Sequence, residues 1–325
     1  MPGCPTCGRN KMRHLERLES ALVSGDFRLL PFATLQEHNL AAYAYTTTDH
    51  PHKTDLGAAF YQATAHHSKT KHELDPLFRA WREAGLEVMV FKGFQLAEYV
   101  YPSSGQRFYN DVDLIFREKD ATQASTIAKD LGWHLLWERS HSDKPYSHAM
   151  FHLAAPSHFT KIDAHRFALQ ALSPLVARQK RMTEKVWSAA KKVPWQDSEI
   201  LTPCPADMVL VGLVLNRFWS PDHWTLRSHD YTDFRFVVER FGLTKVELEA
   251  RAASLGCSRT LRLFLNRCDP WEKRLNLRPP TRFERNLWTL LIIPERGYLY
   301  AEDVVMRGLV RPLLERLLVN KGTHG

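Results

Sequence analysis

Long apolar runs are absent from this sequence. No stretch approaches the roughly 20 consecutive apolar residues that a transmembrane helix needs. The N-terminal residues, MPGCPTCGRNKMRHLERL, also lack the apolar core of a signal peptide. These two absences argue against a membrane protein and a secreted one, so we expect a cytoplasmic protein with no membrane partner.

Cysteine is scarce, and its spacing supports no disulfide framework. The five cysteines are Cys4, Cys7, Cys204, Cys257 and Cys268. An odd number at scattered positions is typical of reduced thiols in the cytoplasm. Cys4 and Cys7 have the spacing of half a zinc knuckle, but no second CxxC follows. Metal binding by this pair and two reduced thiols at a frayed terminus both stay open.

A zinc-protease signature is absent as well. The chain has no HExxH motif, and the His66–His67 pair lies in a polar stretch with helical spacing. With 16 histidines in the chain, neighbouring pairs arise by chance. A metalloprotease-like hydrolase therefore has no support.

The composition that is present is that of a folded protein with excess positive charge. The 325 residues are 44% hydrophobic and 25% charged, which suits one large domain or two moderate ones. The net charge is +8, and the segment 259–285 holds eight Lys and Arg residues against three acids. Such a segment either meets phosphates or an acidic partner, or is the solvated face of helices.

Three zones with different hydrophobic periods follow one another along the chain. Residues 1–86 have helical spacing, with a stop at Gly85, and are predicted to form an N-terminal helical region. Residues 87–170 are predicted to form a small α/β core, and residues 171–325 a C-terminal helical domain. The predicted fold class is α+β, a small mixed β-sheet flanked by helical regions.

Within the core, short β-rich runs alternate with amphipathic stretches. The predicted strands are EVMVF, DVDLIF, WHLLWER, HAMFHLAA and FTKIDAHRF. The predicted helices are QLAEYVY and KDATQASTIAKDLG, the second closed by Gly132.

Two acids interrupt the otherwise apolar strand DVDLIF. Side chains alternate across a strand, so Asp111 and Asp113 share one face while Val112 and Leu114 share the other. Buried carboxylates cost several kcal/mol unless they are paired or bind a metal. Two acids about 6 to 7 Å apart at Cα can turn toward one cation. Mg²⁺ is usually held by one or two carboxylates plus substrate phosphates.

A later strand supplies a third acid. In KIDAH, Asp163 and His165 lie on one face and Ile162 and Ala164 on the other. If this strand neighbours DVDLIF, Asp163 lies beside the acid pair. Three carboxylates on adjacent strands can hold two metal ions for an in-line phosphoryl transfer. Asp163 would also be placed to take a proton from an incoming hydroxyl.

The turn before the acid pair has features of a phosphate site. In VFKGF, Lys92 and Gly93 end a strand and precede a short helix. Glycine lets the backbone approach a phosphate closely, and a helix N-terminus favours anions. Lys92 can neutralise phosphate charge, and the planar fork of Arg107 could hold a phosphate.

In this order, the elements resemble the nucleotidyltransferase superfamily typified by DNA polymerase β. They are most similar to one branch, the uncharacterised nucleotidyltransferases found beside peptide natural-product, including lasso-peptide, biosynthesis genes. That branch has a KG turn, a YP segment, an Arg, a D-h-D-L strand and a later acid-x-His strand. The matching segments here, within about residues 87–167, are VFKG, YVYP, Arg107, NDVDLIF and KIDAHRF. HDYTDFRFVV holds a further counterpart, either Asp230 or Asp233.

The resemblance implies a Mg²⁺-dependent nucleotidyltransferase. Such an enzyme would transfer a nucleoside monophosphate, or a phosphoryl group, from an NTP such as ATP or GTP to a hydroxyl. Asp111, Asp113 and Asp163 would hold two Mg²⁺ ions, with Asp163 also serving as the base. His165 is expected beside the metal ligands rather than among them. The acceptor implied by the branch is a modified peptide or a small molecule.

The triphosphate would be bound by Lys92, Gly93 and Arg107. The chain departs here from the wider superfamily, which has Gly-Ser or Gly-Gly where this sequence has Lys92-Gly93-Phe94. No serine follows the glycine to reach a phosphate, so backbone amides, Lys92 and Arg107 are expected to replace it.

Two alternatives stay open. The basic segment 259–285 keeps an RNA acceptor as the second choice, although no aromatic-plus-basic motif of an RNA-binding module is present. The other alternative is a non-catalytic binding protein that keeps the fold. The three acids speak against it, because an unused acid cluster on a buried strand is destabilising.

Overall fold

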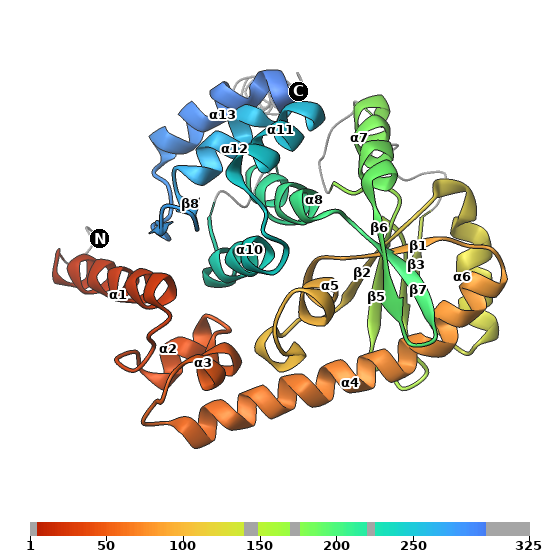
Figure 1. Cartoon of the computed structure of the whole chain (residues 1–325), viewed down its shortest axis with the longest axis horizontal. Helices are drawn as coiled ribbons and strands as arrows, with labels where there is room; N and C mark the ends of the chain where they lie inside the picture. Colours follow the sequence, from red (N-terminus) through yellow and green to blue (C-terminus); the bar gives the residue numbers. More distant parts are fainter. Residues whose placement is uncertain (1–4, 140–148, 170–175, 220–224, 297–325) are drawn as a thin grey trace, which may run out of the picture.

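A seven-stranded sheet with helices on both faces lies in one half of the molecule, and most N-terminal and C-terminal helices lie in the other (Figure 1). In this computed structural model of the chain, the described residues are 5–139, 149–169, 176–219 and 225–296. The mixed sheet flanked by helices confirms the predicted α+β class. Cys4, the side chain of Cys7 and the helices expected between 297 and 318 lie outside the described residues.

The strands of the sheet follow the order β3-β4-β5-β2-β1-β7-β6. Their bounds are β1 Val88–Phe91, β2 Val112–Phe116, β3 His134–Glu138, β4 Ala149–Ala154, β5 Lys161–His165, β6 Lys191–Trp195 and β7 Ser198–Thr202. The central strand β2 runs antiparallel to β1 and parallel to β5. All five strands predicted within the core are therefore confirmed.

Helices precede the sheet along the chain. Their bounds are α1 Pro5–Ser24, α2 Phe32–Glu37, α3 Ala41–Thr47 and α4 Lys53–Glu83. The long helix α4 runs from beside α3 to the sheet (Figure 1). It ends where the sequence predicts, because Gly85 takes a φ of 76° and Leu86 N–H donates to the carbonyl of Trp81 at 2.9 Å.

Two helices and two 3₁₀ turns connect the first strands. They are α5 Lys92–Tyr99, η1 Ser104–Gln106, η2 Glu118–Asp120 and α6 Ala121–Asp130. Gly132, with a φ of 81°, follows α6. Both helices predicted in this part of the chain are therefore present, the first beginning at Lys92.

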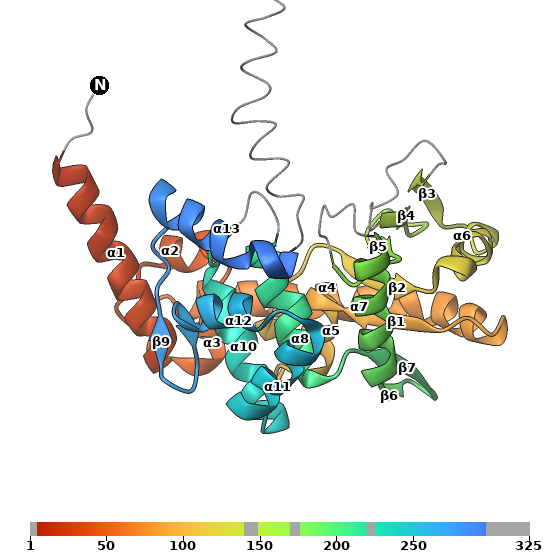
Figure 2. The same cartoon turned by 90° about the horizontal axis from the view of Figure 1, so that it is seen from above.

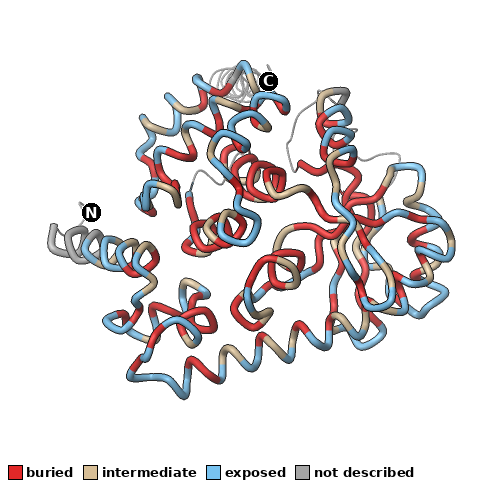
Figure 3. The backbone as a smooth tube through the Cα atoms, in the orientation of Figure 1, coloured by how far each residue is buried: buried red, intermediate tan, exposed pale blue. Residues whose placement is uncertain are grey.

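The sheet is covered on both faces, and its central strands β1 and β2 are apolar except for Asp113. Every residue of β1 and β2 is buried (Figure 3). Val90 and Leu114 pack with α4, α5 and α6 in one core cluster, whereas Met89 and Ile115 join a second cluster with the C-terminal helices. The sequences of strands that are buried on both faces are continuous apolar runs. An acid within β2 is thus an exception that calls for a local partner.

The chain after the sheet core is largely helical. The bounds are α7 Val176–Ala189, α8 Pro205–Val209, η3 Leu210–Leu215, α9 Asn216–Phe218, α10 Ser228–Phe241, α11 Lys245–Leu255, α12 Ser258–Leu265 and α13 Arg282–Arg296, with a two-stranded ribbon of β8 Cys268–Asp269 and β9 Arg274–Leu275. Helices α8 and α10–α13 lie together on one side of α5, and α6 lies on the other side (Figures 1 and 2). Among the described helices, none has both the length and the apolar character for crossing a bilayer.

A β-hairpin lies in the region that the sequence predicts to be helical after residue 170. That expectation is wrong for β6 and β7, which pair antiparallel and add to the sheet beside β1. Trp195 and Ile200 are buried, and Pro194 opposes a helix there. Gln196, at a φ of 49°, makes the turn without a glycine, so the usual hairpin signal is missing from the sequence. The sheet therefore extends past the proposed boundary at residue 170.

Candidate active site

One row of residues crosses four neighbouring strands, and two of the candidate acids lie in it. Phe91 in β1 pairs with Asp113 in β2, which in turn pairs with Asp163 in β5. The row ends at His152 in β4, the partner of Asp163. Because β2 and β5 are in register, Asp113 and Asp163 point to the same face. The expectation that the two acid-bearing strands are neighbours is confirmed.

His165 lies over both acids. It follows Asp163 by two residues and so shares its face of the sheet. Its Nε2 is 3.0 Å from Asp113 Oδ1 and 3.3 Å from Asp163 Oδ2. One potential ligand atom from each of these three residues lies within 4.8 Å of the others. The cluster is compact enough to surround one cation.

Lys92 reaches the same cluster from the turn after β1. The pairing of Phe91 with Asp113 brings the next residue, Lys92, against that carboxylate, and Lys92 Nζ donates to Asp113 Oδ1. Lys92 has a φ of 52°, a left-handed conformation that is uncommon for residues other than glycine. Backbone strain of this kind clusters at functional sites.

Gly93 is required by close packing rather than by its backbone angles. A Cβ at this position would lie 2.8 Å from Cβ of Tyr109. Tyr109 is itself anchored, since its hydroxyl is 2.9 Å from Nδ1 of His67, whose Nε2 lies 2.6 Å from Glu98 Oε2. The turn is therefore held against a rigid wall.

The charges of the cluster depend on one another. Burial works to raise the pKa of Asp113, but Lys92 and His165 outweigh it and hold the pKa below its usual value. Burial and Lys92 work to lower the pKa of His165, yet Asp113 and Asp163 raise it overall. Burial also opposes ionisation of Asp163, but hydrogen bonds from His152 and His165 hold its pKa well below the usual range. Both acids are thus carboxylates at neutral pH.

Asp111 is exposed, lies immediately before β2 and lines the same pocket. Partial burial, followed by the negative charge of Asp113, raises the pKa of Asp111. Within the described residues, no hydrogen bond or ion pair engages its carboxylate. A cation bound beside Asp113 would relieve this repulsion.

These residues border one pocket of about 400 Å³. Six of the seven candidate site residues line it: Lys92, Gly93, Arg107, Asp111, Asp113 and Asp163. The seventh, His165, contacts both acids but is buried, with its side chain only 4% exposed. The structure thus brings all the predicted residues together, and their roles stay predictions.

Arg107 forms an ion pair with Asp233, one of the two aspartates between which the sequence does not decide. Its Nε donates to Asp233 Oδ1 at 2.7 Å and its Nη2 to Asp233 Oδ2 at 2.9 Å. The hydroxyl of Tyr101 also donates to Asp233, at 2.6 Å. Asp233, and not Asp230, lines the pocket. A phosphate near Arg107 would therefore share this guanidinium with a carboxylate.

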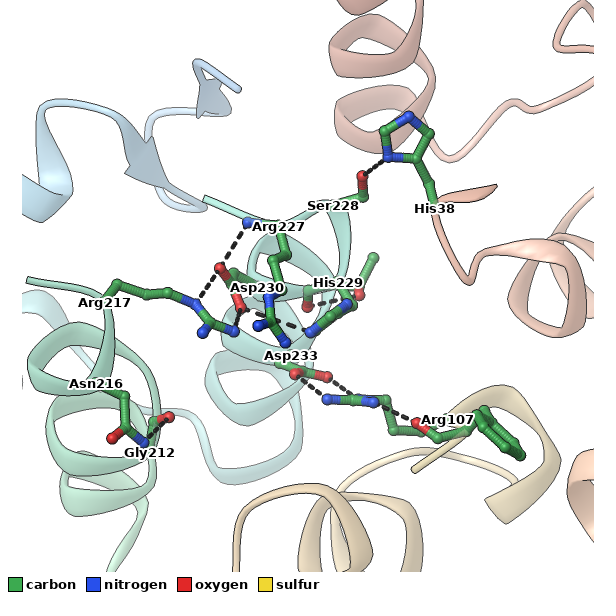
Figure 4. Close-up of polar contacts among 12 residues, drawn as sticks. His38, Arg107, Gly212, Asn216, Arg217, Arg227, Ser228, His229, Asp230 and Asp233 are labelled. Atoms are coloured by element: carbon green, nitrogen blue, oxygen red, sulfur yellow. Dashed lines mark hydrogen bonds and ion pairs between the residues drawn. The ribbon is translucent and has the colours of Figure 1, made fainter. Parts of the chain in front are cut away.

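Residues from α9 and the start of α10 also line the pocket and form its α9–α10 wall (Figure 4). Arg217 in α9 donates to both oxygens of Asp230, each at 2.8 Å. The main-chain N–H of Arg227 donates to the same Asp230 at 2.8 Å. Arg217, Arg227 and His229 all line the pocket. Sequence reasoning missed these three as site residues, although His229 opens the segment HDYTDFRFVV, because no local pattern shows which side chains near α10 reach the pocket.

A π-helical segment shapes this wall. Leu210–Leu215 forms η3, between α8 and α9, and places Gly212 and Leu213 on the pocket. Single π turns inside helices occur often at functional sites. Asn216 follows directly and donates to the carbonyl of Gly212 at 3.1 Å. Its Oδ1 is buried and has no partner among the described residues.

The donor set suits a divalent cation. Carboxylate oxygens are the ligands that Mg²⁺ prefers, with phosphates completing its shell. The imidazole of His165 contacts both Asp113 and Asp163, which is the arrangement of a group that orients ligands. The residues present therefore fit a metal–nucleotide site.

The basic segment 259–285 is partly neutralised within the protein. Arg278 Nη2 lies 2.6 Å from Glu284 Oε1, and Arg274 pairs with Glu272. Arg267 is buried and donates to the carbonyl of Asn276 at 2.9 Å. Part of the charge counted in the sequence is thus used in internal contacts.

Solved structures with a related arrangement are distant. The solution structure of the antibiotic-resistance factor ANT(2'')-Ia is 13% identical at a TM-score of 0.39, covering 61% of this chain and 97% of that one. The crystal structure of ANT(2'')-Ia in complex with adenylyl-2''-tobramycin is 12% identical at a TM-score of 0.36, covering 55% and 92%. An antigenic nucleotidyltransferase-like protein from Paracoccidioides brasiliensis is 11% identical at a TM-score of 0.38, covering 64% and 94%.

No curated protein matches the sequence. A family profile, described as uncharacterised nucleotidyltransferase, matches residues 32–271. The match includes all seven candidate site residues and the wall formed by α9 and α10. The chain therefore belongs to this uncharacterised nucleotidyltransferase family and is a transferase.

Proposed function

We propose that the protein transfers a nucleoside monophosphate from an NTP, either ATP or GTP, to a hydroxyl group with the help of Mg²⁺. The observation that best supports this is the gathering of Asp113, Asp163 and His165 within 4.8 Å, in a pocket that Lys92 and Arg107 also line. Acids for a metal and cations for a triphosphate are the two requirements of the reaction.

Each side chain has a part in the proposed reaction. Asp111, Asp113 and Asp163 hold the metal, which when bound neutralises charge on the phosphates. Asp163, ionised at neutral pH, accepts the proton as the acceptor oxygen forms its bond to the α-phosphorus and the bond to pyrophosphate breaks. Lys92, which pairs with Asp113, would contact the triphosphate when Asp113 serves as a metal ligand. His165 keeps the two carboxylates oriented.

The proposed acceptor is a hydroxyl of a peptide or a small molecule, as in tailoring of a peptide natural product. The sequence resemblance to the branch found beside such biosynthesis genes supports this choice. An RNA acceptor is less favoured, because Arg267, Arg274 and Arg278 of the basic segment make contacts within the protein.

Mass spectrometry of products tests the proposal. The full chain is incubated with Mg²⁺, each NTP in turn and a panel of hydroxylated peptides and small molecules. An acceptor heavier by one nucleoside monophosphate, with release of pyrophosphate, is the expected product, whereas a gain of one phosphate would mean phosphoryl transfer. The Asp111→Ala/Asp113→Ala double variant should form no product. Unchanged turnover in that double variant would contradict the proposed roles of Asp111 and Asp113.

A further inference from the structure

Two charged side chains in the pocket lack an ion-pair partner within the described residues. Lys92 is paired with Asp113, and Arg107 with Asp233. The exceptions are Asp111 on the sheet side and Arg227 on the α10 side, both of which line the pocket. The pocket therefore presents an unpaired anion and an unpaired cation, which come from different elements.

Arg227 is held in place by its backbone while its guanidinium stays available. It occupies the N-cap position of α10, where its main-chain N–H is bonded to Asp230. Its side chain extends toward Arg217 and His229 (Figure 4). The charge of Arg217, followed by partial burial, lowers the pKa of Arg227. The two positive guanidinium groups repel each other, and an anion bound between them would offset that repulsion.

The other arginines of the pocket are already committed. Arg217 gives two N–H groups to Asp230, and Arg107 gives two to Asp233. Asp230 is fully buried, and Arg217 overcomes the effect of burial to hold its pKa at about 2, so this carboxylate stays charged. Arg227 is therefore the cation of this wall with the most hydrogen-bonding capacity for a ligand.

We propose that Arg227, assisted by Arg217, binds the β- and γ-phosphates of the NTP. This inference rests on the proposed function and assigns the polyphosphate to the α9–α10 wall. A metal–triphosphate complex satisfies both unpaired charges at once, since its cation meets Asp111 and its phosphates meet Arg227. A simple anionic acceptor would satisfy only the second. Pyrophosphate would then leave from the α9–α10 wall.

Calorimetric titration of the full chain separates a phosphate contact from a general loss of binding. The ligands are ATP, GTP and the two corresponding monophosphates, with Mg²⁺ present. Arg227→Gln should weaken NTP binding by about 10- to 100-fold, the usual range for a lost charged hydrogen bond, and leave monophosphate binding unchanged. The NTP affinity of Arg227→Lys should lie between those of Arg227→Gln and wild type, because lysine keeps the positive charge but lacks the planar guanidinium that binds two oxygens at once.

Arg240→Gln is the matched control, because Arg240 lies exposed near the end of the same helix and does not border the pocket. It should bind every ligand as wild type does. Equal NTP affinity in Arg227→Gln and wild type, or an equal loss for NTP and monophosphate, overturns the inference while leaving the proposed function intact. A wild-type protein that binds no NTP with Mg²⁺ contradicts the proposed function itself.

Discussion

At the scale of single residues, the site depends on charges held by their neighbours. The sequence predicts that Asp113 and Asp163 face the same side, because strand alternation fixes side-chain direction without knowledge of the fold. It does not predict Arg227 or His229, since their place on the pocket depends on how α10 packs against the core. The sequence also does not show that Asp233 forms an ion pair with Arg107, because two residues 126 positions apart leave no local pattern.

His229 makes the folded state sensitive to acid. Burial, then the positive charge of Arg107, lowers the pKa of His229 from 6.5 to about 4. Between these values the unfolded chain binds a proton that the folded chain does not, so stability falls as pH drops from 6.5 toward 4. The loss attributable to this group is about 3 kcal/mol.

Urea unfolding at a series of pH values measures this effect. His229→Gln, which cannot be protonated, should reduce the dependence of the unfolding free energy on pH across that window. The same pH dependence in the variant and in wild type would show that His229 is not held neutral by the fold.

At the scale of elements, the turn from β1 into α5 was predictable and the β6–β7 hairpin was not. The dipeptide Lys92-Gly93 after an apolar run marks a strand end in the sequence. What the sequence hides is the reason for the glycine, since its contact with Tyr109 joins residues 16 positions apart only after folding. The hairpin lacks a glycine turn and its strands are short, so the sequence gives no clear signal for two strands within a region predicted to be helical.

Two glycines of the pocket should respond in opposite ways to alanine. Gly93→Ala places a Cβ 2.8 Å from that of Tyr109, so the turn must shift, and we expect a loss of about 1–3 kcal/mol in unfolding free energy. A Cβ at Gly212 meets nothing within 4 Å, and alanine there should be neutral or stabilising by up to about 1 kcal/mol.

Denaturant unfolding of the two variants in parallel tests this difference. The NTP affinity of Gly93→Ala should also fall, because the backbone that faces the phosphates moves with the turn. If both alanines have the same effect on stability, the tight packing of Gly93 on Tyr109 is not real.

At the scale of the whole molecule, one buried ion pair connects the sheet core to the C-terminal helices. Arg107 precedes β2, whereas Asp233, 1% exposed, belongs to α10. The sequence indicates helical regions on both sides of a small sheet, yet the packing of α10 against the core depends on long-range contacts. Such contacts follow from three-dimensional complementarity and leave no periodic trace in the chain.

Asp233→Asn should destabilise the protein strongly. It leaves the Arg107 guanidinium buried without its carboxylate, a change that typically costs about 3–5 kcal/mol. Glu239, whose side chain is 56% exposed, lies 3.3 Å from Arg235 on the same helix, and Glu239→Gln should cost at most about 1 kcal/mol. Chemical denaturation of both variants provides the comparison, and equal stability of the two would contradict a structural role for the Arg107–Asp233 pair.

The most direct test of the central claim is Mg²⁺-dependent pyrophosphate release by Asp113→Asn. Wild type should release pyrophosphate from its preferred NTP only when a divalent cation is present. Asp113→Asn should lower the rate by at least about 10²-fold, as expected when a group acting on the transition state is removed. Asp197→Asn, exposed in the β6–β7 turn, should retain the wild-type rate. Release that persists in Asp113→Asn, or that needs no divalent cation, would contradict the account.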